Sequence, residues 1–173
     1  MDFIQTKKKI MNNILIKDII RQLEDAENGD LWLDENFEKK LAQVSEEQAF
    51  VRPLPELHSV AELLSHLIVW RRVNVRRMQG ENLDMPDSHP DNWKSNELLK
   101  THYTWKSLKE DFHTSQQEVI ALLSGKDDSY LDTVSTHYGK TFKYLLEGLI
   151  HHDMYHMGQL GITIKYLKLQ SES

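Results

Sequence analysis

The sequence predicts an all-α protein, a four-helix bundle with a crossover connection. Apolar residues recur with helical period in four stretches of the 173-residue chain, and no stretch keeps the period-two alternation of a half-buried strand. The connections between the four stretches differ in length, and residues 81–103 are long enough to return along the bundle. The length suits one hydrophobic core, so we expect a single domain over residues 1–173.

The first stretch covers residues 16–44. Its helical pattern is interrupted by Asn28, Gly29 and Asp30, which predicts either one helix with a break or two helices in tandem. Pro53 and Pro55 then favour an extended connection, because proline lacks an N–H donor and disfavours helical geometry in the residue before it. The apolar residues that define the pattern are Ile16, Ile19, Ile20 and Leu23, followed by Leu33, Phe37, Leu41 and Val44.

The second helix is predicted to run from Ser59 to about Gly80. Ser59 and Glu62 have the spacing of a capping box, in which each side chain accepts a hydrogen bond from the other residue's backbone N–H. Residues 81–103 contain two prolines and have no helical period, so we predict a long crossover loop, and loops of this length are often functional.

The remaining helices are predicted at residues 105–123 and 141–169. The first of them should end at Ser124 and Gly125, where glycine suits the left-handed conformation of a helix terminus. Residues 127–140 are predicted to be irregular.

Composition excludes several classes of function. Lys and Arg number 21 against 27 Asp and Glu, giving a net charge of −6, so we expect no nucleic-acid partner. No cysteine is present, so a metal ion must be bound by histidine, carboxylate or water. Polar residues between positions 10 and 20 interrupt any signal-peptide core after Lys7, Lys8 and Lys9, and we expect a cytoplasmic protein without a membrane partner.

Histidine spacing suggests a metal site. His152 and His156 are four residues apart on the apolar face of the last predicted helix, so both rings can reach one ion. Hydrogen bonds to buried partners would satisfy the same pair, and spacing leaves both interpretations open. His66, on the second predicted helix, is the candidate third ligand, although a lone histidine there is more often a satisfied core residue. The other histidines are expected to be solvated: His58, His89, His102, His113, His137 and His151.

Two motifs together resemble the DinB-like (YfiT-like) superfamily of bacterial metal-binding four-helix bundles. They are His66 after the Ser59 capping box, and the run from His152 through His156 to Gly158 and Gln159. The resemblance implies that His66, His152 and His156 ligate a divalent ion, with zinc or nickel expected and iron or manganese compatible with the same ligands. It also implies a homodimer.

The resemblance further implies a small-molecule enzyme, either a thiol-dependent S-transferase using a low-molecular-weight thiol or a metal-dependent hydrolase. The metal would activate the thiol or a water molecule, and the catalytic residues beyond the metal site are unknown. We expect Trp70 and Gln159 to line the substrate pocket, because both lie near the ligand side of their helices. The alternative is a non-catalytic, metal-stabilised binding or stress-response module.

A further interpretation treats His152, Asp153 and His156 as a variant of the zinc-protease helix motif, with Asp153 in place of the glutamate base. It ranks low, because aspartate is one methylene shorter and only polar and small residues follow Leu169. The ordinary pKa of histidine predicts that metal binding weakens below about pH 6.

Overall fold

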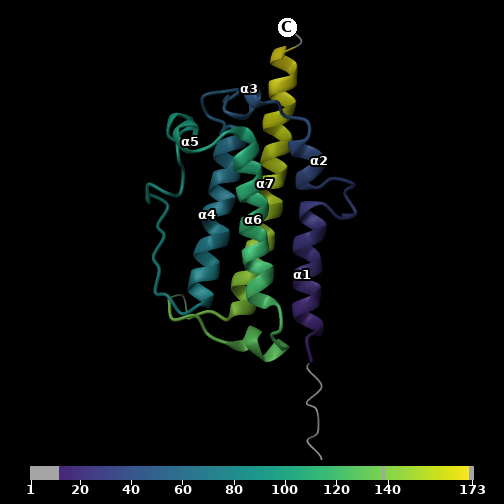
Figure 1. The fold of residues 1–173 in the computed structure, drawn as a ribbon, viewed down its shortest axis with the longest axis vertical. Helices are drawn as coiled ribbons and strands as arrows, with labels where there is room; N and C mark the ends of the chain where they lie inside the picture. The colour runs from purple at the N-terminus through teal and green to yellow at the C-terminus, as the bar shows by residue number, and fades with distance from the viewer. Residues whose placement is uncertain (1–11, 138, 172–173) are drawn as a thin grey trace, which may run out of the picture.

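The computed structural model describes residues 12–137 and 139–171, so Lys7, Lys8 and Lys9 lie outside the described residues. Four long helices form a bundle (Figure 1): α1 (Ile14–Glu27), α4 (Val60–Met78), α6 (Trp105–Leu123) and α7 (Phe142–Ser171). Helix α4 packs against α6 and α7, and α1 packs against the same two helices from the other side. The all-helical bundle predicted from the sequence is confirmed.

The chain follows a crossover topology. In Figure 1, α4 and α6 both run downward, whereas α1 and α7 run upward. The segment after α4 therefore has to climb the full height of the bundle before α6 begins. This segment, residues 79–95, is the crossover connection that the sequence predicts, and it passes along one side of the bundle.

The sequence correctly predicted the start of α4 and the end of α6. Ser59 Oγ accepts a hydrogen bond from Glu62 N, and Glu62 Oε2 accepts one from Ser59 N, so the predicted capping box is confirmed. Helix α6 ends at Leu123, and Gly125 has a φ of 77°, the left-handed conformation expected there. Helix α7 is one continuous element of 30 residues.

The connections contain helices that the sequence interpretation left out. The predicted loop 81–103 includes α5 (Asn96–His102), which begins at Ser95, where the hydroxyl accepts a hydrogen bond from Leu98 N. This N-cap was not recognised in the sequence, because Ser95 lies in a segment dominated by polar residues. The segment 127–140 contains the 3-10 helix η1 (Asp128–Asp132), and α3 (Glu46–Ala49) precedes α4. Within the first predicted stretch, residues 16–44, the break at Asn28 is followed by the short helix α2 (Phe37–Leu41), and Leu33 is exposed.

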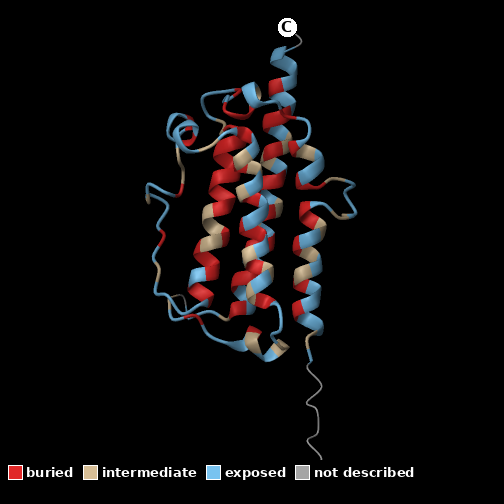
Figure 2. Cartoon of the chain, in the orientation of Figure 1, coloured by how far each residue is buried: buried red, intermediate tan, exposed pale blue. Residues whose placement is uncertain are grey.

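Two apolar clusters fill the bundle, and a polar layer separates them. The first cluster includes Leu67, Phe112 and Leu160, and the second includes Val75, Val119 and Leu146. Each long helix contributes residues to both clusters, and Figure 2 shows the buried faces of these helices in red. The buried polar residues between the clusters are Glu27, Arg71, Asn74, Ser115, Gln116, Asp153 and His156.

A buried ion pair holds the centre of this layer. Arg71 on α4 donates from Nη2 to Asp153 Oδ2 on α7 at 2.8 Å, and both side chains are essentially inaccessible to solvent. Arg71 also donates to Phe112 O on α6 at 3.1 Å. Three of the four long helices therefore meet at one guanidinium.

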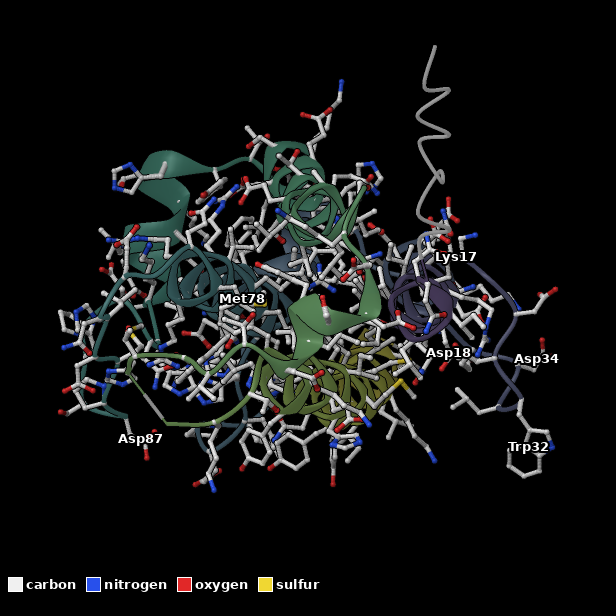
Figure 3. All side chains as sticks on the ribbon, turned by 90° about the horizontal axis from the view of Figure 1, so that it is seen from below. Lys17, Asp18, Trp32, Asp34, Met78 and Asp87 are labelled. Atoms are coloured by element: carbon white, nitrogen blue, oxygen red, sulfur yellow. The ribbon has the colours of Figure 1, made fainter. Side chains whose placement is uncertain are left out.

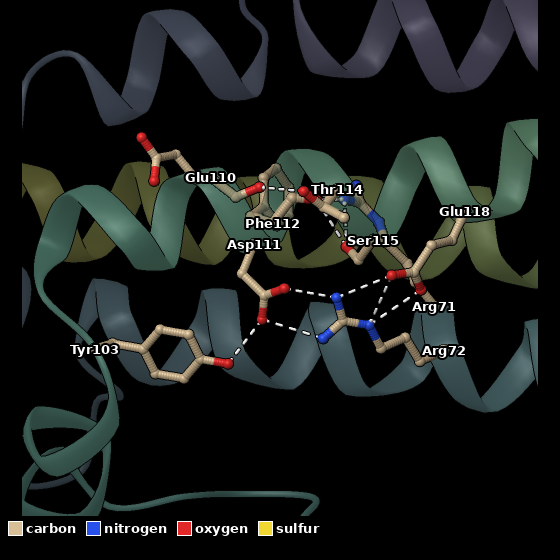
Figure 4. A network of polar contacts seen from close by, with 9 residues as sticks. All are labelled: Arg71, Arg72, Tyr103, Glu110, Asp111, Phe112, Thr114, Ser115 and Glu118. Carbon is tan, nitrogen blue, oxygen red and sulfur yellow. Dashed lines mark hydrogen bonds and ion pairs between the residues drawn. The ribbon is translucent and has the colours of Figure 1, made fainter.

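A second network joins α4 to α6 nearer the surface. Arg72 contacts Asp111 Oδ1 at 2.6 Å and Glu118 Oε1 at 3.0 Å, and Tyr103 donates to Asp111 Oδ2 at 2.7 Å (Figure 4). Because these groups are partly exposed, each pair contributes little to stability. None of the described helices is long and apolar enough to cross a membrane.

Candidate metal centre

Helices α4 and α7 bring three histidines together. His66 Nε2 lies 3.0 Å from His152 Nε2, and His152 Nε2 lies 3.1 Å from His156 Nε2. One ring nitrogen of each residue lies within 4.8 Å of the others, so the three can hold a metal ion. These residues, His66, His152 and His156, are called the histidine cluster below. His66 and His156 are buried, and His152 is half-buried.

The proton positions on the outer nitrogens favour a cation at the centre. His66 Nδ1 donates to Asn92 O at 3.0 Å, and His156 Nδ1 donates to Gln159 Oε1 at 2.6 Å. Each of these rings therefore presents a lone pair on Nε2. His152 can supply one Nε2 proton at most, so one lone pair remains unsatisfied unless a cation binds. The outer carbonyl partners also match the usual surroundings of metal-ligating histidine.

The spacing of the nitrogens suits metal coordination. Histidine nitrogens lie about 2.0–2.1 Å from zinc, so two of them at a tetrahedral ion are about 3.3–3.4 Å apart. The Nε2 separations of 3.0 and 3.1 Å in the histidine cluster are within a few tenths of an ångström of this value. The cluster therefore fits a divalent ion with little rearrangement.

Burial keeps the histidine cluster neutral. It lowers the pKa of His66 to about 4 and the pKa of His152 to about 3, and it lowers the pKa of His156 as well. The cationic form is disfavoured because each ring loses hydration and faces the other two rings. A neutral imidazole is the form that binds metal, so the site is ready for an ion at neutral pH.

The crossover loop supplies residues of the site that sequence reasoning missed. The Trp93 ring stacks on the His66 ring with centroids 3.9 Å apart, and His58 stacks on the opposite face of Trp93 at 3.7 Å. Asn92 is buried, and its Oδ1 accepts a hydrogen bond from Trp70 Nε1 at 2.9 Å. The roles of Asn92 and Trp93 could not be predicted, because the loop has no helical period. The length of the loop was the only signal of a functional role. His58 is thus half-buried in a stack and is not a freely solvated side chain.

A cavity of about 740 Å³ opens beside the histidine cluster. It lies between α4, α7 and the crossover loop, and His66 and His152 form part of its wall. The other lining residues are Trp70, Asn74, Arg77, Asp87, Asn92, Trp93, Tyr144, Leu145, Gly148, Leu149 and Tyr155.

The two residues expected to line the pocket have different positions. Trp70 lies on the wall of the large cavity. Gln159 lies behind His156, where it accepts the Nδ1 hydrogen bond, and it lines a smaller cavity of about 90 Å³ with His58 and Thr163. Its position on α7 suits it to orient His156, because a helix places residues three apart on the same face.

Asp153 does not face the cavity as a general base would. Its side chain is 1% exposed and engages Arg71, so the zinc-protease interpretation has no base at this position. Among the remaining histidines, His113 donates from Nδ1 to Glu27 Oε1 at 2.9 Å, which ties α6 to α1. His151 is exposed on α7, as predicted.

The fold and the site define a helical-bundle protein in which three neutral histidines from two antiparallel helices lie together, two of them on the wall of a cavity. The model of the DinB superfamily matches residues 32–160, which span α2 to α6 and all three histidines. The chain belongs to the DinB superfamily. Comparisons with curated proteins and with solved structures give no match.

Proposed function

We propose that this DinB protein is a metal-dependent small-molecule enzyme, active as one domain over residues 1–173 in the cytoplasm. The observation that supports this function is that His66 and His152 lie on the wall of the 740 Å³ cavity. A divalent ion held by the histidine cluster, zinc or nickel in the first place and iron or manganese as alternatives, would lower the pKa of a thiol or water in its open position.

The cavity suits a small organic substrate. Its volume lies within the range of about 300–1,000 Å³ that ligand pockets occupy, and Trp70 and Trp93 give it aromatic walls. The histidine cluster would hold the ion, Asn92 and Gln159 would orient two of the rings, and the cavity would position the electrophile. The reaction classes we propose are thiol-dependent S-transfer, with a low-molecular-weight thiol as cosubstrate, and hydrolysis of small esters or amides.

A purely structural role for the ion is less well supported. In that alternative the ion would serve only to tie α4 to α7. The buried pair of Arg71 and Asp153 already joins the same two helices within the same polar layer. Binding of exogenous thiols or anions at the ion would distinguish an open, reactive centre from a closed structural one.

Thermal unfolding tests the metal site. Free metal at a hundredfold excess over Kd stabilises a folded protein by about 2.7 kcal/mol, which for this size raises the Tm by roughly 5–10 °C. A chelator should abolish the increment, and His66→Ala should reduce or remove it although residue 66 is far from the pair in sequence. His151→Ala is the matched control, because His151 is exposed on α7, and it should keep the full increment. An unchanged increment and metal affinity in His66→Ala would refute the site.

We also propose a homodimer formed through α7. Five large side chains on this helix are exposed and lie within a sector of about 60° at 100° per residue. Exposed apolar stripes of this kind mark interaction surfaces, whereas Trp32, at the outer edge of the molecule in Figure 3, projects singly from a loop. A second copy of the chain offers the same stripe for a symmetric contact. The five residues are Tyr144, Tyr155, Ile162, Tyr166 and Leu169.

A further inference from the structure

We infer that the cavity binds molecules with a carboxylate at the end distant from their reacting group, and that Arg77 recognises this carboxylate. The inference rests on the proposed function in one respect, because the other end of the ligand is taken to meet the histidine cluster. It adds a specificity determinant, Arg77, and a class of ligand.

Arg77 is a buried cation on the cavity wall. It is 2% exposed, and it lies on the same side of α4 as His66, Trp70 and Asn74, all of which line the cavity. Its Nε donates to Leu83 O at 3.0 Å, which holds the guanidinium in one orientation. Because arginine stays protonated in proteins, Arg77 places a positive charge on the cavity wall.

The distances place Arg77 within reach of a small molecule bound at the histidine cluster. The guanidinium carbon of Arg77 lies 5.7 Å from the centre of the Trp70 ring, and that ring lies 6.0 Å from the centre of the His152 ring. The path from the guanidinium carbon through the Trp70 ring to the His152 ring is therefore shorter than about 13 Å, the length of four extended residues of peptide. Trp70 stands between His66 and Arg77 along α4, and all three line the cavity, so its ring can pack against the apolar body of the ligand.

The charge distribution favours an anion. The protein carries a net charge of −6, so a buried cation in a cavity is a local exception. Asp87 is the one carboxylate among the described lining residues, and it is exposed at the edge of the molecule (Figure 3). Arg77, by contrast, is shielded from water, where a hydrogen-bonded ion pair is stronger. A ligand carboxylate therefore gains more at Arg77 than it loses to Asp87.

Gly148 supplies room for the ligand between the two ends. A Cβ atom added at this position would meet no heavy atom within 4 Å. Gly148 lies on α7 one turn before His152 and lines the cavity. A larger side chain at this exposed position would therefore have room to extend into the cavity.

The experiment compares two thiols of equal length on cobalt-loaded protein, 6-mercaptohexanoate and 6-mercaptohexan-1-ol. Thiolate ligation changes the visible absorption of Co²⁺, which gives a Kd for each thiol independently of turnover. We expect the acid to bind about tenfold tighter or better, as a charge-assisted hydrogen bond predicts. Arg77→Gln should bring the ratio close to one. Arg76→Gln is the matched control and should keep the preference, because Arg76 is exposed and pairs with Glu81 at 2.6 Å.

Equal affinity of the two thiols for the unmodified protein, or an unchanged preference in Arg77→Gln, would overturn the inference. If Arg77→Gln fails to fold, Gly148→Leu tests the same cavity by filling it. This variant should lose both six-carbon thiols yet still bind 2-mercaptoethanol, whereas Gly158→Leu, also in open space on α7, should bind all three normally. Normal binding of both six-carbon thiols by Gly148→Leu would also overturn the inference.

Failure of the proposed function gives a different result. If no thiol alters the cobalt spectrum, the ion has no open position, and the proposed function is wrong. The role of Arg77 is then decided by calorimetry of hexanoate and hexan-1-ol on the metal-free protein. A preference for hexanoate that Arg77→Gln removes would support the anion site, and equal affinities would refute it.

Discussion

The three imidazoles of the histidine cluster are neutral because they are buried together, and this has consequences for pH dependence. An unfolded histidine has a pKa near 6.5, whereas the folded pKa is about 4 for His66 and about 3 for His152. Between these values the unfolded chain binds more protons than the folded one. The contribution of these histidines to the free energy of unfolding is therefore complete above about pH 6.5, and it declines as the pH falls toward 4.

We predict that the metal-free protein loses stability between pH 7 and pH 5, with about 2 kcal/mol of the loss due to His66. Urea unfolding in the presence of chelator measures this. The Kd for metal should change little over the same range, because the folded pKa values of His66 and His152 lie below it, which revises the expectation that binding weakens below about pH 6. His151→Ala should show the same pH slope of stability. A tenfold weaker Kd for metal at pH 5 would contradict the assigned pKa values.

Among the residues of the site, the sequence predicted those that recur at a helical interval and missed those that lie in an irregular loop. The interval of four between His152 and His156 is a local property of a helix, so periodicity could find the pair. Asn92 and Trp93 meet His66 from 26 and 27 positions away across an irregular loop, and no spacing rule connects them. The sequence predicted that Gln159 lies near the ligand side of its helix, but its hydrogen bond with His156 is seen only in the structure.

Helices α4 and α7 carry the site, and their relative position depends on the buried pair of Arg71 and Asp153. Arg71 also lies over the Phe112 ring at 4.1 Å, so its charge interacts with α6 as well. Removal of the carboxylate would leave a guanidinium buried without its counter-charge. Such a loss costs far more than the loss of a surface pair.

We predict that Asp153→Asn lowers the free energy of unfolding by about 3–5 kcal/mol. Urea denaturation measures the change, and metal content per folded protein should stay the same, because Asp153 faces away from the cavity. Asp111→Asn, in the partly exposed network of Arg72, is the control and should cost about 1 kcal/mol or less. A similar cost for both variants would show that burial of the Arg71 pair is not decisive.

The length of a helix decided whether its first residue could be predicted from the sequence. Ser59 precedes a strong apolar period, so its cap was recognised and confirmed. Ser95 begins α5 with the same chemistry, but α5 has only seven residues, too few for a period to emerge from the polar sequence around it.

The whole molecule presents two long faces of α7, one toward the bundle and one toward solvent. The inner face supplies His152 and His156, and the outer face carries the exposed stripe that we assign to a second copy. Tyr155 belongs to the stripe and also lines the cavity, so a partner would lie close to the cavity entrance.

Sedimentation velocity should therefore find a dimer, and Ile162→Glu should convert it to a monomer by placing a charge within the apolar contact. Ile162 is 53% exposed, so the variant should fold normally. Leu15→Glu is the control, since Leu15 is 48% exposed on α1 and away from the stripe. A monomer before any substitution would disprove the assignment.

The crossover loop has an evolutionary consequence. The side chains of the histidine cluster are fixed by two packed helices, whereas Asp87, Asn92 and Trp93 reach the cavity from residues 79–95, a segment outside the regular helices. Insertions and substitutions accumulate in such segments more readily than in packed helices. On the proposed function, a change in this loop would therefore alter which substrate the cavity accepts, while the histidine cluster on α4 and α7 would stay the same.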